Sequence, residues 1–504
     1  MFKVKYRELI TYSEFFLDKI MENVFKIIVG NKVAIYLLSR YVVYFIIFVN
    51  SMTMAAHLGP YYMGVWGSIV LILRYFQVFN FGVSNSMTVL LVQNKKDLKR
   101  CDDLEMSAMV LMGLISLFVV SIGVYYMLVG IPFLDKFELG NRFYFVCLIA
   151  IFQYLNDYCF CINRVKGRMF EFTFYQTFLN LILLPIIFLA YENLLITYLI
   201  IAYIFSHLIS LLLFVSRGDI SFRGCFFLGL AKEIVKKSFY IFIYNFCFYL
   251  VILSTKTIIA KNYSVEEFGY FSFAYTLAHA SLLLLTAFSS LITPKLIDKF
   301  NTDDMSVIQK TVSSLRTNYV TCSHFVMYLT MALFPILLEF LPKYQTALIA
   351  INLTSLATLL YTNSFGYISL LMAKNKERIL ALSTFLILVI NVCLAWVLAV
   401  IIKIDYSYVV LATLFSYLFY AFIVVYRGWQ FLGIEISFYG IIKEIIPVRL
   451  LVPFFVACVM SIINRGWLMW FPVVVFVVFN LRDLKIIANT MITIIERPNI
   501  IDVK

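Results

Sequence analysis

The sequence predicts an all-α protein that crosses a membrane many times. Of its 504 residues, 63% are hydrophobic and only 14% are charged, whereas about a quarter of the residues of an ordinary soluble domain are charged. Apolar runs of about 20 residues, the length with which a helix crosses the hydrocarbon of a bilayer, alternate with short clusters of charge. Helices are expected because an open sheet would leave backbone groups unpaired in lipid.

The apolar runs predict about fourteen transmembrane helices. They lie near residues 33–54, 62–92, 104–129, 143–162, 169–190, 194–215, 238–260, 268–293, 317–341, 345–373, 379–402, 406–426, 446–463 and 467–481. The first twelve form two sets of six, separated by the charged segment "AKEIVKKS". We therefore expect a segment at 1–32, two pseudo-symmetric lobes at 33–218 and 219–435, and an extra pair of helices with the C-terminus at 436–504.

The distribution of positive charge predicts the orientation. A net charge of +13 would suggest a nucleic-acid partner in a soluble chain. Here most Lys and Arg residues fall in every second segment between apolar runs, and cytoplasmic loops are the loops rich in these residues. We therefore predict cytoplasmic termini and no nucleic-acid partner. Residues 1–32 mix basic with apolar residues, which is typical of a helix lying on a membrane surface.

The chain contains an internal repeat with an offset of about 205 residues. "HLGPYYMGVW" aligns with "NYSVEEFGYF", so that Gly64 matches Gly269. Because an even number of spans separates the two copies, both halves would enter the membrane in the same direction, as in transporters with parallel repeats. The alternative is that glycine and aromatic residues at helix ends match by chance.

Polar residues inside the expected spans also coincide between the halves. The same register pairs Arg40 with Asn245, Ser51 with Lys256, and Arg74 with His279. Helical spacing places them on stripes with the further polar residues Tyr44, Gln77, Asn80, Asn85 and Tyr249. We expect these stripes to line a cavity shared by the two halves.

The stretch "LGPYYMGVWGSIVLILRYFQVFNFGVSNSMTVLL", Leu58 to Leu91, carries a family resemblance. A glycine follows a short outer turn, an aromatic residue lies beside it, and an N-x-G element from Asn80 to Gly82 closes the second span. "VEEFGYFSFAY" and "NRVKGR" occupy the corresponding places later in the chain. This layout resembles the polysaccharide exporters and O-antigen flippases (Wzx type) of the multidrug/oligosaccharidyl-lipid/polysaccharide (MOP) superfamily.

The resemblance implies two six-helix lobes around a central cavity that opens alternately to each side of the bacterial inner membrane. It implies no enzymatic activity and no cofactor. The implied substrate is an oligosaccharide linked to undecaprenyl pyrophosphate, and membrane lipids and the polysaccharide polymerase machinery are the implied partners. Many O-antigen flippases have twelve spans, so the extra pair after residue 446 departs from that pattern.

Three cations fall within expected spans: Arg40, Arg74 and Lys256. A cation near the centre of a membrane helix costs about 2.5–3.5 kcal/mol, so something must offset that cost. One interpretation is that the three side chains face an aqueous cavity and bind the pyrophosphate, because guanidinium groups form paired, charge-assisted hydrogen bonds with phosphate oxygens. The alternative is that each pairs with a carboxylate or extends to the membrane interface.

Asp157 is a carboxylate placed well inside an expected span. It is either a proton or sodium site that couples transport to an ion gradient or a structural partner of an arginine. The nine cysteines show no metal-ligand spacing, so no metal site is predicted.

Other functions compete with the flippase. An ion-coupled exporter of small molecules, of the multidrug and toxin extrusion type, would share the architecture, but such exporters bind cations and would favour carboxylates over the three cations found here. A membrane glycan polymerase or ligase would need a large outer loop with catalytic residues, and the expected outer loops are short. A channel would need a filter-like repeat, and none is apparent.

Overall fold

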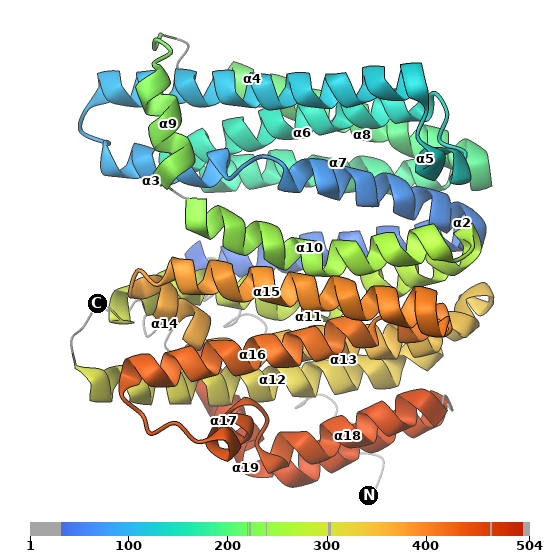
Figure 1. The fold of residues 1–504 in the computed structure, drawn as a ribbon, viewed down its shortest axis with the longest axis vertical. Helices are drawn as coiled ribbons and strands as arrows, with labels where there is room; N and C mark the ends of the chain where they lie inside the picture. The colour runs from blue at the N-terminus through green and yellow to red at the C-terminus, as the bar shows by residue number, and fades with distance from the viewer. Residues whose placement is uncertain are drawn as a thin grey trace, which may run out of the picture.

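The computed structural model describes residues 32–218, 220, 223–237, 239–300, 304–463 and 466–496. Within these ranges the regular structure is helical and no strand occurs (Figure 1). The expected surface helix at 1–32 lies outside the described residues except for Lys32, at which the first described helix begins. The prediction of an all-α membrane protein is confirmed.

The first half of the chain forms seven helices among the described residues. They are α2 (Lys32–Val78), α3 (Val83–Gln93), α4 (Leu98–Val129), α5 (Pro132–Lys136), α6 (Arg142–Val165), α7 (Met169–Ile187) and α8 (Glu192–Arg217). Helix α2 carries two of the expected spans, because Gly59 adopts φ 66° and ψ 173° inside it and Pro60 follows. A positive φ of this kind suits glycine, which has no Cβ to clash with the backbone.

The second half begins with α9 (Leu228–Lys237) and α10 (Phe239–Asn262). It continues with α11 (Val265–Phe300), α12 (Met305–Glu339), η1 (Pro342–Ala347), α13 (Leu348–Thr362), α14 (Tyr367–Ala373), α15 (Glu377–Trp396), η2 (Val397–Ile402), η3 (Tyr406–Tyr408) and α16 (Leu411–Leu432). The last elements are α17 (Phe438–Ile445), α18 (Val448–Ile463), η4 (Gly466–Met469) and α19 (Trp470–Glu496).

Helix lies in every expected span, but the number of membrane crossings stays a prediction. In the described residues, eight helices are long and apolar enough to cross a membrane, or up to ten if each bent pair forms one span. The bent pairs are η1–α13 with α14, at 43°, and α17 with α18, at 67°. The count takes α2 as one helix although Gly59 divides it.

The helices form two groups and an extra pair (Figure 1). Helices α3 to α8 lie together, and α10 to α16 form the second group, with α18 and α19 at its far edge. Helix α2 packs against α6, α7 and α8 of the first group and against α11 of the second. Helix α9 packs on α3 and α4, and the guanidinium of Arg100 bonds both carboxylate oxygens of Glu233 at 3.1 Å.

Two glycines bring α2 and α11 into backbone contact near α5. A Cβ added to Gly64 would lie 2.0 Å from the carbonyl oxygen of Val265, and one added to Gly269 would lie 1.9 Å from that of Pro60. These contacts are reciprocal, since Gly64 and Pro60 match Gly269 and Val265 in the repeat. Small residues allow such close helix crossings in membranes. The repeat found in the sequence is thus a structural pseudo-symmetry at this crossing.

Candidate functional site

Arg74 lies between the two groups of helices. Its side chain is exposed, and Nη1 donates a hydrogen bond to Oε1 of Gln77 at 2.7 Å. Its charge interacts electrostatically with Asp157 on α6, Lys256 on α10 and His279 on α11. Titratable side chains from both halves of the chain therefore lie near Arg74, and its exposure allows it to be hydrated.

Lys256 is held by an aromatic pair of the second group. It is 6% exposed, and its Nζ lies 3.6 Å from the ring centroid of Tyr275. The rings of Tyr275 and His279 lie 4.0 Å apart, at 33°. A cation over an aromatic face is attracted by the ring quadrupole, so Tyr275 supports the ammonium at this buried position.

We call Arg74, Asp157, Lys256, Tyr275 and His279 the charged cluster. It contains two basic side chains, Arg74 and Lys256, and one carboxylate, so basic groups outnumber acidic ones. The predicted residues Arg74, Lys256, His279 and Asp157 are brought together here, from α2, α10, α11 and α6. In chemical terms the arrangement suits an anion with more than one oxygen, which can accept hydrogen bonds from both cations.

The predicted residues of the first half of α2 lie elsewhere on that helix. Arg40 and Tyr44 are half-buried. Tyr41, between them, lies near Cys322 on α12, so this part of α2 faces the second group. The hydroxyl of Ser51 donates a hydrogen bond to a carbonyl one turn earlier in its own helix, at 2.8 Å.

The N-x-G element forms the break between α2 and α3. Oδ1 of Asn80 accepts a hydrogen bond from the backbone N–H of Gly82 at 2.9 Å, while Phe81 and Gly82 adopt φ of 51° and 70°. The side chain of Asn80 thus supports a local turn. A Cβ at Gly82 would lie 2.9 Å from Cβ of Phe242 on α10, so the turn packs against the second group. Asn85 lies on α3, and its side chain is outside the described part of the chain.

Tyr249 and Asn245 lie on α10 beside an aromatic cluster that the sequence did not reveal. Tyr249 is 59% exposed and Asn245 is half-buried. The ring of Phe248 lies 4.5 Å from that of Tyr361 on α13 and 5.7 Å from that of Tyr417 on α16. The chain has 34 tyrosines, so the sequence alone could not single out the tyrosines of this cluster.

The end of the molecule near α5 is closed by contacts between the two groups. Nζ of Lys136 on α5 donates hydrogen bonds to carbonyl oxygens at the end of α10, those of Ala260 (2.7 Å), Lys261 (3.1 Å) and Tyr263. A cation at a helix C-terminus is stabilised by the unpaired carbonyls there. Burial lowers the pKa of Lys136 from its usual value. The hydroxyl of Tyr344 on η1 also donates to the carbonyl of Ala55 at 3.1 Å.

A second polar network was missed by the sequence reasoning. Arg316 on α12 is 5% exposed and forms an ion pair with Glu444 on α17. Its Nη2 donates to the carbonyl oxygen of Asn363 at 3.0 Å, and its guanidinium lies 5.0 Å from the ring centre of Tyr367. Arg316 thus joins α12 and α17 to the break between α13 and α14. Its position just before an expected span made it look like a loop cation.

Glu105 on α4 is a buried carboxylate. It is 1% exposed, and its Oε1 lies 2.9 Å from Nζ of Lys166. The hydroxyl of Tyr158 donates to the backbone carbonyl of Glu105 at 3.0 Å. In the described residues, no group of three or more His, Cys, Asp or Glu side chains could hold a metal ion.

No protein-family model matches the sequence, and no curated protein matches it. Two solved structures resemble the fold. One is the inward-facing conformation of a multidrug resistance MATE family transporter of the MOP superfamily, with a TM-score of 0.63 and 9% identity over 77% of this chain and 94% of that chain. The other is the lipid II flippase MurJ in an inward closed conformation, with a TM-score of 0.64 and 13% identity over 91% of this chain and 99% of that chain. The protein therefore has the fold of MOP-superfamily transporters.

Proposed function

We propose that the protein is a flippase for an oligosaccharide linked to undecaprenyl pyrophosphate, an O-antigen repeat unit or a similar glycan. It moves this lipid from the cytoplasmic to the outer leaflet of the bacterial inner membrane by alternating access. The charged cluster carries the proposal, because it brings two basic side chains and one carboxylate together between the two groups of helices.

Each member of the cluster has a distinct part in binding. The exposed guanidinium of Arg74 offers a planar fork to the phosphate oxygens, and Lys256 adds a point charge from the facing group. Without substrate, Gln77 holds Arg74 and the Tyr275 ring holds Lys256. Asp157 then offsets part of the positive charge near Arg74. We also assign Arg40 to the pyrophosphate path, because its stretch of α2 faces α12.

The neighbouring folds support a transporter and include one that handles a lipid-linked substrate, the lipid II flippase MurJ. The other neighbour is a multidrug resistance transporter. Together with Asp157, it supports a second candidate function, the export of small molecules. Asp157 on α6 lies near the cation Arg74 on α2. Such a carboxylate could bind a proton or a sodium ion, as an ion-coupled exporter of small molecules requires.

The proposal is tested by complementing a strain that lacks its O-antigen flippase. Arg74→Ala and Lys256→Ala should abolish surface glycan while the amount of protein in the membrane stays unchanged. Arg427 is a matched control for Arg74, because its Nη1 bonds Oε1 of Gln430, three residues later, at 2.9 Å. Arg427→Ala on α16 should leave the glycan intact.

Full glycan export by Arg74→Ala would contradict the assignment of Arg74 to the pyrophosphate. If the wild-type chain fails to complement but lowers the accumulation of cationic dyes, and Asp157→Asn removes that effect, the exporter is the better assignment.

A further inference from the structure

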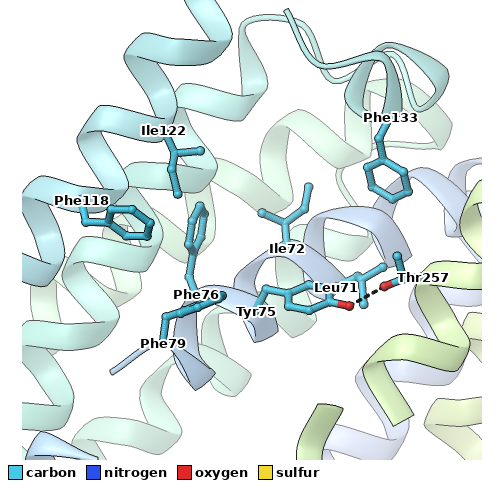
Figure 2. Close-up of a pocket in the computed structure, with 9 residues that line it drawn as sticks. All are labelled: Leu71, Ile72, Tyr75, Phe76, Phe79, Phe118, Ile122, Phe133 and Thr257. Carbon is cyan, nitrogen blue, oxygen red and sulfur yellow. Dashed lines mark hydrogen bonds between the residues drawn. The ribbon is translucent and has the colours of Figure 1, made fainter. Parts of the chain in front are cut away.

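An apolar pocket lies directly beside the charged cluster. It has a volume of about 330 Å³, near the lower end of the range for ligand pockets. Its lining residues are Leu71, Ile72, Tyr75, Phe76, Phe79, Phe118, Ile122, Phe133 and Thr257 (Figure 2). They come from α2, the break that follows it, α4, α5 and α10, so both groups of helices build the pocket.

The pocket and the cations share two helices. Tyr75 follows Arg74 on α2, and Thr257 follows Lys256 on α10. Consecutive helical residues point about 100° apart, so each helix presents a cation on one face and the pocket on the next. The hydroxyls of Tyr75 and Thr257 lie 2.6 Å apart and form a hydrogen bond (Figure 2). This bond marks the boundary between charged and apolar surfaces.

The polar atoms at the pocket wall are already paired. The Tyr75 hydroxyl also lies 3.4 Å from the carbonyl oxygen of Leu253, and the Thr257 hydroxyl donates to that carbonyl at 2.8 Å. The rest of the lining is aliphatic or aromatic. Water needs two to four polar partners to occupy a cavity, and this lining offers too few. The occupant is therefore expected to be hydrocarbon.

The pocket also leads towards the apolar outer surface of α4. Phe118 lines the pocket and is 50% exposed, and Leu114 and Leu117 on the same helix are 57% and 64% exposed. A chain that starts at the charged cluster can therefore run past Phe118 to a surface that suits lipid.

We propose that this pocket binds the first part of the hydrocarbon chain of the lipid whose phosphates the charged cluster holds. The inference rests on the proposed function and adds the place at which the chain leaves the cluster, between α2, α4 and α10. The basic side chains beside the pocket indicate that its occupant is a lipid with a negatively charged headgroup. A polyprenyl pyrophosphate joins phosphate directly to hydrocarbon, and the two surfaces that accept these parts are one residue apart on two helices.

The test measures binding of two probes, undecaprenyl pyrophosphate and inorganic pyrophosphate, to the full chain in lipid nanodiscs. Ile122→Trp fills the pocket from α4. It should weaken undecaprenyl pyrophosphate binding at least ten-fold and leave pyrophosphate binding unchanged. Val124→Trp adds the same ring at a position of α4 that is 51% exposed and outside the pocket lining, and should change neither. If folded Ile122→Trp bound undecaprenyl pyrophosphate as tightly as the wild-type chain does, the proposal that this pocket binds the hydrocarbon chain would be overturned.

Two further measurements separate the possible failures. A photoreactive polyprenyl pyrophosphate should label peptides of α2, α4 or α10 in the wild-type chain. Labelling confined to α18 and α19 would overturn the proposal. Because this measurement uses the wild-type chain, it remains decisive even if Ile122→Trp fails to fold. Arg74→Ala should weaken both probes. If the wild-type chain binds neither, the proposed function fails, and the assignment of the pocket falls with it.

Discussion

The glycine crossing between α2 and α11 predicts a measurable conformational shift. In Gly269→Ala the added carbon would lie 1.9 Å from the carbonyl oxygen of Pro60 and 2.8 Å from the backbone nitrogen of Gly64. Ordinary contact begins at 3.4 Å, so the helices would have to separate by about 1.5 Å, the difference from 1.9 Å. Both obstructing atoms belong to backbone and cannot rotate away.

The expected magnitude follows from overpacking, which costs about 1–3 kcal/mol in a well-packed interface. The form with the α5 end closed should therefore lose population about 5- to 150-fold relative to a form in which the helices separate. Alanine also favours a helix over glycine by about 0.5–1 kcal/mol. The gain in helix propensity applies equally to the closed form and to the form with separated helices, so it does not change the ratio of their populations.

Spin labels at Tyr191 and Lys403, both exposed near α5 and carried by different groups, would report the separation by pulsed electron resonance. The nine native cysteines would first be replaced. Gly269→Ala should shift the distances upward. Gly113→Ala is the matched control, because a Cβ there meets nothing within 4 Å. An unchanged distribution in Gly269→Ala, or an equal shift in Gly113→Ala, would refute the reasoning.

Three further outcomes follow from contacts outside the crossing. Lys136→Met removes the donor at the end of α10 and should shift the same label pair in the same direction; unchanged distances would show that this contact does not hold the end closed. Glu444→Gln leaves the Arg316 charge without its ion pair and should lower the free energy of unfolding in detergent by about 1–3 kcal/mol, whereas an unchanged melting curve would argue against the network. Asp304 caps α12, and hydrogen bonds from the Ser306 side chain and from backbone N–H groups lower the pKa of Asp304. The contribution of this cap should be complete above its usual pKa of 3.8 and lost as the pH falls through the lowered value. Hydrogen exchange in the first turn of α12 should rise in that acidic range, and Asp304→Ala should remove the pH dependence.

The architecture was predictable because its signals are local. Apolar runs of spanning length predicted where helices lie, and the Gly64 and Gly269 match predicted a repeat that the crossing of α2 and α11 then displayed. Even the meeting of Arg74 with Lys256 could be anticipated, since matched stripes on related helices face the same region.

Side-chain partners were less predictable, because they depend on packing between distant segments. Helix α12 begins at Met305, well before its apolar stretch, so hydropathy placed Arg316 in a loop although it is buried against α17. Asn80 was predicted as a cavity residue from its polarity, which could not reveal that its side chain accepts a hydrogen bond from the backbone of its own turn. Lys136 had no sequence signal, since its partners are carbonyl oxygens, which every residue carries.

The divergence of the repeat has a consequence for how a ligand would be oriented. A perfect duplication would present equal groups on opposite walls, and a ligand could bind in two equivalent poses. Here the counterpart of Arg74 is His279, and that of Lys256 is Ser51. The repeat thus gives a pseudo-symmetric backbone with different polar side chains in its two halves. An asymmetric headgroup bound there would have a single favoured pose, which is what directional movement of a molecule with distinct ends requires.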